Sequence, residues 1–185
     1  MKMKNKYRKV VFVILFGAMI IIASRSALFA SYVVEGESME PTLDDGNLLM
    51  VNKFVYDLTE VDRFDVIVFR ANEKEDYVKR VIGIPGDTIY YQDDKLYING
   101  NYVEEDFLQE YAQATLSNKT YTENFSLEEV TGETKVPKGK LFVMGDNRGE
   151  SLDSRAFGFI AQTQLVGKVD VKYWPISQAS LSLGN

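Results

Sequence analysis

Ser38 is the first residue whose type and surroundings suggest chemistry. It lies in the segment GESMEPTL at residues 36–43, where a glycine permits close backbone approach and a proline sets a turn. A serine hydroxyl becomes an effective nucleophile when a neighbouring base removes its proton. Serine beside glycine and proline is also common in plain loops, so both interpretations stay open on this segment alone.

Lys79 is a candidate for such a base. Lys79 and Arg80 interrupt the apolar run between Tyr77 and Ile82. Adjacent side chains of a strand point to opposite faces, so one of these two charged side chains must face inward or into a cleft. A lysine that protects an exposed strand edge is the alternative, and Lys79 taken alone fits both equally well.

A dense polar cluster at residues 144–155 follows another apolar run. Its sequence, MGDNRGESLDSR, contains two aspartates, two arginines and two serines. A solvated turn fits this composition, and so does a calcium loop, although the arginines oppose a cation. A hydroxyl from this cluster could instead orient the amine of Lys79 without placing a stabilising negative charge beside it.

The residue types that the chain lacks narrow the chemistry further. The 185 residues include no histidine and no cysteine. This excludes a Ser-His-Asp triad, an imidazole-bound zinc, a thiol nucleophile and disulfides. The base that activates a serine must then be a carboxylate or a neutral lysine. The pKa of lysine is ordinarily about 10.4, and burial against neighbours such as Val78 and Val81 lowers it by disfavouring the ammonium form.

Charge and hydropathy divide the chain at its amino-terminal end. The first nine residues carry five basic side chains and no acidic one, so a net charge of −6 leaves −11 on residues 10–185. The acidic body argues against nucleic acid as a partner. Residues 10–23 contain no polar side chain, and a second apolar stretch ends at Ala30. We expect a cytoplasmic basic tail over residues 1–9 and one transmembrane helix over residues 10–30, with a cleavable secretory signal as the alternative.

The remainder, residues 31–185, is expected to be an extracytoplasmic domain of mainly β structure. Four runs rich in β-branched and aromatic residues predict strands at residues 48–54, 65–69, 77–82 and 140–144. The pair Asn99-Gly100 between two further runs predicts a hairpin with a type I′ turn. Because residues 104–134 are polar with little periodicity, we expect residues 92–137 to form an inserted hairpin and cap region.

Together and in this order, the motifs resemble those of the bacterial type I signal peptidases, in particular the shorter Gram-positive type. The shared features are the apolar amino-terminal segment, Gly-x-Ser-Met-x-Pro-Thr, Lys-Arg-Val-x-Gly-x-Pro-Gly-Asp, and Gly-Asp-Asn-Arg followed by Ser-x-Asp-Ser-Arg. The resemblance covers nearly the whole chain. It implies a signal-peptidase-like β core behind one amino-terminal transmembrane helix, and a serine-lysine dyad that needs neither metal nor organic cofactor.

The resemblance also assigns roles to individual residues. It makes Ser38 the nucleophile and Lys79 the general base, and it assigns Ser151 to hydrogen-bond and orient the lysine amine. Many family members carry a serine at the position of Gly36, and its hydroxyl contributes to the oxyanion hole. With glycine there, we expect the Gly36 backbone to join the Ser38 N–H in stabilising the oxyanion. The charged residues that brace the site by this resemblance are Arg80, Asp146, Asp153 and Arg155.

The substrates of this family are exported preproteins with small residues at the first and third positions before the cut. The resemblance places the shallow apolar pockets that read them at Tyr32, Val34, Met39, Leu43, Tyr77 and Val78. An extended substrate would be held by backbone hydrogen bonds along the strands that carry Val34 and Val78. The expected partners are therefore signal-peptide-bearing preproteins and the lipid bilayer, close to the secretion translocon at the cytoplasmic membrane.

Two other functions remain as alternatives. Degenerate members of the family act as non-catalytic, membrane-anchored pilus or secretion assembly factors, but they lack the dyad, so Ser38 with Lys79 favours catalysis. Self-cleaving repressors share the broad fold and the chemistry, but they are soluble and carry a DNA-binding segment that this chain lacks.

Overall fold

The computed structural model describes residues 7–17, 28–108, 120–181 and 183 of the chain. Residues 7–17 are helical, and their large apolar side chains are exposed, Phe12 at 68% for example. Among the described residues, no helix has the length and hydropathy needed to cross a membrane. The anchor expected over residues 10–30 lies partly outside the described residues, and its last two residues belong to the first strand, β1 (Phe29–Val33).

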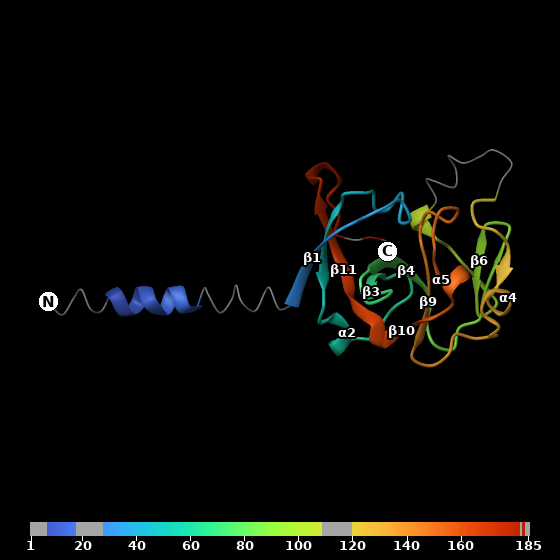
Figure 1. Ribbon diagram of the computed structural model, residues 1–185, viewed down its shortest axis with the longest axis horizontal. Coiled ribbons are helices and arrows are strands. Elements are labelled where there is room, and N and C mark those ends of the chain that lie inside the picture. The colour runs from blue at the N-terminus through green and yellow to red at the C-terminus, as the bar shows by residue number, and fades with distance from the viewer. Residues whose placement is uncertain (1–6, 18–27, 109–119, 182, 184–185) are drawn as a thin grey trace.

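The domain expected over residues 31–185 is mainly β, as predicted, and it contains two antiparallel sheets (Figure 1). The larger sheet has seven strands in the order β1-β2-β11-β3-β4-β9-β10. Its strands after β1 are β2 (Leu48–Asn52), β3 (Val66–Arg70), β4 (Asp76–Gly83), β9 (Lys140–Met144), β10 (Ile160–Ala161) and β11 (Leu165–Trp174). The four runs predicted as strands from their β-branched and aromatic residues are confirmed as β2, β3, β4 and β9.

The smaller sheet has the order β7-β6-β5-β8. Its strands are β5 (Ile89–Gln92), β6 (Lys95–Ile98), β7 (Asn101–Val103) and β8 (Phe125–Ser126). The predicted hairpin is confirmed, because β6 and β7 pair antiparallel and both Asn99 (φ 53°) and Gly100 (φ 79°) adopt the positive φ angles that a type I′ turn requires. The sheet begins at Ile89, slightly before the insertion expected at residue 92.

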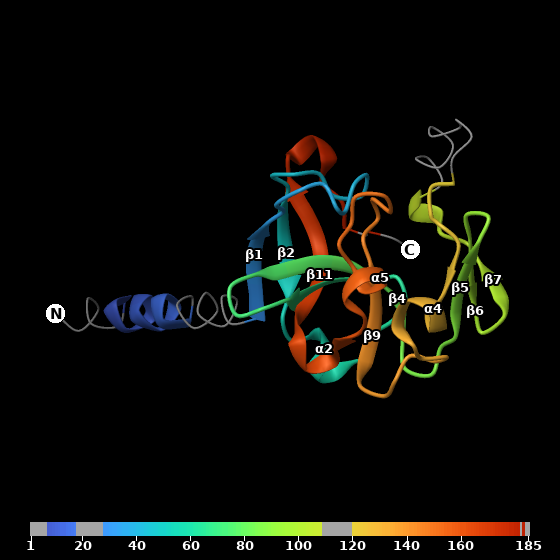
Figure 2. The same ribbon diagram turned by 45° about the vertical axis from the view of Figure 1, so that its right-hand side comes forward.

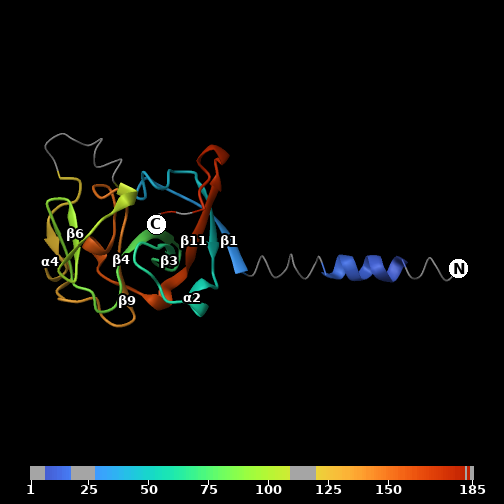
Figure 3. The ribbon, with the colours of Figure 1, turned by 180° about the vertical axis from the view of Figure 1, so that it is seen from behind.

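Short helices connect these strands. They are α2 (Val55–Leu58), α4 (Leu127–Thr131) and α5 (Ser154–Phe157), with 3-10 turns η1 (Asp106–Leu108), η2 (Gln162–Gln164) and η3 (Ile176–Gln178). Helix α4 follows β8 directly and starts with a capping box, in which Ser126 Oγ accepts from Glu129 N and the Glu129 carboxylate accepts from Ser126 N. Figures 2 and 3 show the small sheet and α4 at one end of the β domain, and β1, β2 and β11 at the other.

The larger sheet curls so that its first strand approaches its fifth. The phenol of Tyr32 in β1 donates a hydrogen bond to Asp76 at the start of β4, although three strands separate β1 from β4 in the sheet. The interior of this curl is filled by a buried apolar cluster of Val34, Met39, Leu43, Leu49, Val51, Val66, Val68 and Val169. The segment between β1 and β2 packs into this cluster through Met39 and Leu43. This packing positions Ser38, the residue before Met39.

Candidate active site

Lys79 of β4 and Ser38 of the segment between β1 and β2 are in direct contact. Lys79 Nζ donates a hydrogen bond of 2.7 Å to Ser38 Oγ. Only 4% of Lys79 is exposed, and this burial lowers the pKa of its amine to about 8, while the charges of Asp153 and Asp146 act in the opposite direction. The arrangement therefore brings a hydroxyl into contact with an amine that loses its proton near neutral pH, which suits nucleophilic catalysis by serine.

Lys79 and Arg80 at the centre of β4 are both buried. The sequence required one of Lys79 and Arg80 to face inward, and in the structure both do, with Arg80 fully buried. Lys79 pairs with Ile67 of β3 and Arg80 with Val66, so the two side chains leave opposite faces of the sheet. Lys79 enters the cleft beside Ser38, and Arg80 enters the packed interior.

Arg80 is held in that interior by Asp146, another of the residues predicted to brace the site. Arg80 Nε and Nη2 donate to the two carboxylate oxygens of Asp146 at 2.8 and 2.6 Å, and both side chains are fully buried. Thr42 Oγ1 donates to Asp146 Oδ2 and accepts from Arg80 Nη2. This ion pair thereby fixes the segment that follows Ser38 against β4.

Asp153 and Arg155, the other two predicted bracing residues, organise the polar loop between β9 and α5. Asp153 accepts from Gly145 N at 3.0 Å and from Arg155 Nε and Nη2 at 2.9 and 2.8 Å. Burial alone would raise the pKa of Asp153, but these hydrogen bonds and the Arg155 charge outweigh it and hold the pKa below its ordinary value. Asp153 stays ionised and keeps Gly145 in place.

Gly145 fills a position where any larger residue would collide. A Cβ at Gly145 would clash with the Ser38 carbonyl oxygen and with the side chain of Ser151. Ser151 therefore lies close to the Ser38 backbone. Its Oγ is buried and, within the part of the chain that the structure describes, has no hydrogen-bond partner. The expected hydrogen bond from Ser151 to the Lys79 amine is thus not formed in this conformation.

Gly36 differs from expectation in one respect. It has φ +86°, a conformation that favours glycine, but its N–H donates to Asp45 Oδ1 at 2.7 Å. The Gly36 N–H, which was expected to face an oxyanion, is therefore hydrogen-bonded to the Asp45 carboxylate. The Ser38 N–H, by contrast, has no acceptor among the described residues, and it remains the backbone donor available beside Ser38 Oγ.

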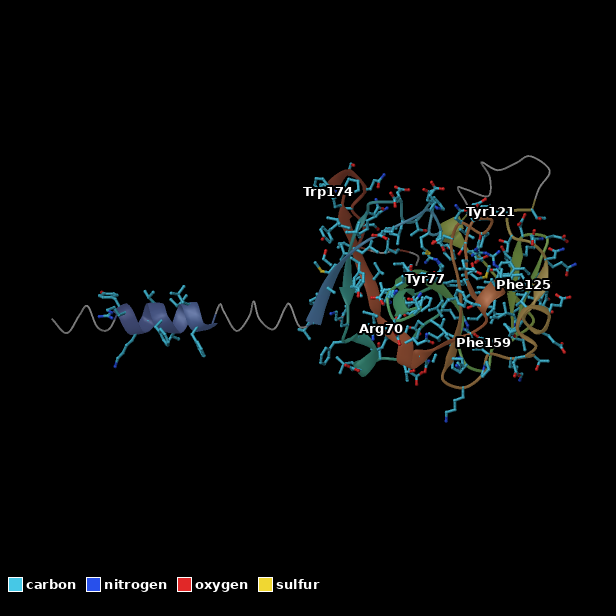
Figure 4. All side chains as sticks on the ribbon, viewed as in Figure 1. Arg70, Tyr77, Tyr121, Phe125, Phe159 and Trp174 are labelled. Atoms are coloured by element: carbon cyan, nitrogen blue, oxygen red, sulfur yellow. The ribbon has the colours of Figure 1, made fainter. Side chains whose placement is uncertain are left out.

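A cleft with a volume of about 940 Å³ opens over the dyad. Of the six expected pocket residues, Tyr32, Tyr77 and Val78 line this cleft. The other three, Val34, Met39 and Leu43, are at most 4% exposed and belong to the apolar cluster beneath it, against which Tyr32 and Val78 pack. Figure 4 shows Tyr77 near the middle of the β domain, between Trp174 of β11 and Phe125 of the small sheet in this view.

Several site residues were missed by sequence reasoning. Asn147 donates from its backbone to Ser38 O and from Nδ2 to Glu37 O, both at 3.1 Å, which ties the polar loop to the nucleophile segment. Lys172 of β11 donates to Thr42 O at 2.9 Å. Asn147 lies within the Gly-Asp-Asn-Arg motif and was identifiable from it, whereas nothing in the local pattern around Lys172 singles it out.

No group of three metal-ligating side chains gathers within the residues that the structure describes. The two aspartates of the polar loop, Asp146 and Asp153, form ion pairs with Arg80 and Arg155.

Comparison with known proteins agrees with this geometry. The family described as "Signal peptidase, peptidase S26" matches residues 7–174. The chain belongs to the signal peptidase family. A protein named "Signal peptidase I" from Bacillus caldolyticus is 57% identical over 164 residues, which cover 88% of this chain and 90% of that protein. "Signal peptidase I V" from Bacillus subtilis (strain 168) is 47% identical over 148 residues, covering 80% of this chain and 88% of the relative.

A solved structure supports the fold as well. The crystal structure of a signal peptidase I from Enterococcus faecalis V583 aligns with a TM-score of 0.57 at 43% identity, and it covers 60% of this chain and 97% of that chain. The predicted family and the mainly β core are thus confirmed. The region matched to the signal peptidase family runs from the amino-terminal helical residues to the last residue of β11, so it includes Ser38, Lys79 and the polar loop.

Proposed function

We propose that this chain is a membrane-anchored serine endopeptidase that removes amino-terminal signal peptides from exported preproteins. The observation that carries the proposal is the 2.7 Å hydrogen bond from Lys79 Nζ to Ser38 Oγ at the base of an open cleft. The named relatives are signal peptidases, and the family match over residues 7–174 includes the segments that hold Ser38 and Lys79.

The mechanism follows from the state of the lysine. With a pKa of about 8, a substantial fraction of Lys79 is neutral at mildly alkaline pH and accepts the Ser38 proton as Oγ attacks the scissile carbonyl. The Ser38 N–H stabilises the tetrahedral oxyanion. The lysine then gives its proton to the leaving amine, which leaves an acyl-enzyme on Ser38. The same amine next takes a proton from water, and the resulting hydroxide equivalent hydrolyses the ester.

Ser151 has a defined place in this cycle. Its buried hydroxyl lies against Gly145, which in turn contacts the Ser38 backbone. A hydroxyl without a partner can rotate, and a hydrogen bond to the Lys79 amine would compensate for its burial. We assign Ser151 to orient the amine during deacylation, when the Ser38 oxygen is part of the ester and Lys79 has lost its hydroxyl partner.

Substrate binding is supported by the free backbone edge of β4. Strand β9 pairs with β4 only from Arg80 to Gly83, so the stretch from Asp76 to Lys79 pairs with β3 alone among the described strands. Strand β1 is the end strand of the same sheet and lies across the cleft. A signal peptide bound as an extended strand along these edges needs no particular sequence for its backbone hydrogen bonds. Selectivity for small residues at the first and third positions before the cut then falls to the apolar pockets around Tyr32, Tyr77 and Val78.

The amino-terminal segment supports a membrane location. Seven consecutive large apolar residues, residues 10–16, are each at least 48% exposed on the described helix, and the apolar sequence continues to Ala23. Such a surface is stable when lipid covers it, and the five basic residues in front favour the cytoplasmic side. We propose that the apolar segment that begins at residue 10 and ends before β1 anchors the chain, with residues 1–9 inside and the β domain outside, near the translocon where cleavage sites emerge.

Cleavage of a preprotein with a small-x-small junction tests the proposal. The full chain should release the mature protein at that junction, while Ser38→Ala and Lys79→Met abolish the product. Ser177→Ala and Lys135→Met change exposed residues of the same types and should leave the rate unchanged. Full activity in either dyad variant, measured by product mass, would contradict the assignment.

A further inference from the structure

A side-chain hydrogen bond between β1 and β4 crosses the substrate cleft. Tyr32 Oη donates to Asp76 Oδ2 at 2.9 Å, and both residues line the cleft. Tyr32 belongs to β1 and Asp76 is the first residue of β4, and in the sheet order these strands are separated by β2, β11 and β3. The bond therefore connects the two opposite walls of the groove in which an extended peptide would lie.

The position of this bond along the groove follows from strand geometry. Asp76 and Val78 lie on one face of β4, two residues and about 6.6 Å apart. Val78 is next to Lys79, whose amine contacts Ser38 Oγ. An extended peptide also repeats its side chains on one face every two residues. If the residue just before the cut lies level with Val78, the residue two positions earlier lies level with the Tyr32–Asp76 bond.

The bond also has support on each side. Tyr32 packs against the apolar cluster inside the curl, which includes Val34 and Met39. Asp76 pairs with Arg70 in the β3–β4 register, and Arg70 Nε lies 4.0 Å from Asp76 Oδ1. The Tyr32 ring is thus fixed at its base by packing and at its hydroxyl by a carboxylate, so the ring cannot turn aside without losing the hydrogen bond.

We propose that the Tyr32–Asp76 hydrogen bond sets the size limit for the third residue before the cleavage site, an inference that rests on the proposed function. A small side chain fits above the fixed ring. A long or branched side chain needs the ring to move and the hydrogen bond to break. Asp76 thereby becomes a specificity-determining residue, although its own side chain is polar and does not form an apolar pocket wall.

The test compares two substrates that differ only at the third position before the cut, with alanine in one and leucine in the other. The readout is the leucine-to-alanine ratio of kcat/KM, because a uniform loss of activity cancels in it. Tyr32→Phe removes the hydroxyl but keeps the ring, and Asp76→Ala removes the acceptor. Each should raise the ratio about tenfold, the lower end of what one pocket contact discriminates. The double variant should rise no further than the single ones, because both remove one bond.

Matched controls separate this inference from the proposed function. Tyr102→Phe removes an exposed hydroxyl in β7 and should leave the ratio as in the wild type. An unchanged ratio in Tyr32→Phe and Asp76→Ala, or additive effects in the double variant, overturns the inference while cleavage of the alanine substrate still upholds the proposed function. If the wild type does not cleave the alanine substrate in a Ser38-dependent way, both fall together.

Discussion

At the scale of single residues, the state of Lys79 depends on a balance between burial and charge. The apolar surroundings of the amine disfavour the ammonium form, whereas the carboxylates of Asp153 and Asp146 favour it. Those carboxylates are each neutralised by an arginine, Arg155 and Arg80 respectively. The arginines therefore do more than brace the loop, because they limit how strongly the aspartates hold the proton on Lys79.

This balance predicts the pH dependence of cleavage. Only neutral Lys79 accepts the serine proton, and the folded pKa of about 8 lies below that of free lysine. Below that value kcat/KM should fall about tenfold for each unit of pH, and above it the rate should level off. The measurement is kcat/KM for a preprotein peptide from about pH 6 to about pH 10, and the profile should fit the titration of a single proton. A flat profile across this range would show that another group supplies the base.

The roles of individual residues were only partly accessible from the sequence. The absence of histidine and cysteine made a lysine the natural base, and the ordered motifs pointed to Ser38 and Lys79, which the structure brings into contact. Asp45 was missed because its interaction with Gly36 depends on how the intervening loop closes. Lys172 was missed for the same physical reason, since 130 residues separate it from its partner Thr42.

At the scale of elements, the segment between β1 and β2 is a closed loop that presents Ser38. Val34 N donates to Asn47 O and Gly46 N donates to Val34 O, both at 2.9 Å, so the two ends of the loop are joined. Inside this frame the Asp45 carboxylate accepts the Gly36 N–H. The loop is therefore rigid on the side away from the cleft, and its conformation at Gly36 depends on one exposed acceptor.

Replacement of Asp45 tests which role the Gly36 N–H has. We expect Asp45→Ala to lower kcat about tenfold. The hydrogen bond to the charged acceptor stabilises the active loop conformation by about 1.5 kcal/mol, and its loss depopulates that conformation about tenfold. Asp45→Asn keeps an oxygen acceptor and should retain most of the activity with an unchanged KM. If Asp45→Ala instead raises kcat, the carboxylate competes with the oxyanion for the Gly36 N–H, and the backbone contribution expected from the sequence is correct.

Strand prediction succeeded where the pattern was local. Strands β2, β3, β4 and β9 are bounded by turn residues and carry β-branched or aromatic side chains, so they were identifiable one by one. Strand β11 was not singled out, although it is the longest strand and lies between β2 and β3. Register shifts against both β2 and β3 interrupt the alternation of inward and outward side chains along β11. Its lysines and aspartate also obscure the two-residue period of apolar side chains. The curl that brings β1 near β4 is a non-local property that no single segment encodes.

At the scale of the whole molecule, a buried cation, Arg148, connects the small sheet to the polar loop. Arg148 Nη2 donates to Glu105 Oε1 at 2.6 Å, and Nη1 donates to Tyr91 Oη of β5 and to Thr122 Oγ1. Arg148 Nε donates to the carbonyl oxygen of Gly145, the glycine that lies against the Ser38 backbone. The inserted region expected from composition alone is therefore also a structural support, because the polar loop rests on it.

Removal of this cation should destabilise the domain strongly. Arg148→Met leaves Glu105, which is only 8% exposed, without its partner, and breaking a buried pair from one side costs about 3–5 kcal/mol in the free energy of unfolding. The measurement is urea unfolding of wild type and variant at one pH.

Arg70→Met is the control, because the Arg70 side chain is 69% exposed and pairs with Asp76 at 4.0 Å. The loss of this pair should cost less than about 1 kcal/mol. Changing Glu105 to leucine in the Arg148→Met background removes the stranded carboxylate and should restore part of the stability. An Arg148→Met variant as stable as Arg70→Met would show that the small sheet and the polar loop are held together by apolar packing instead.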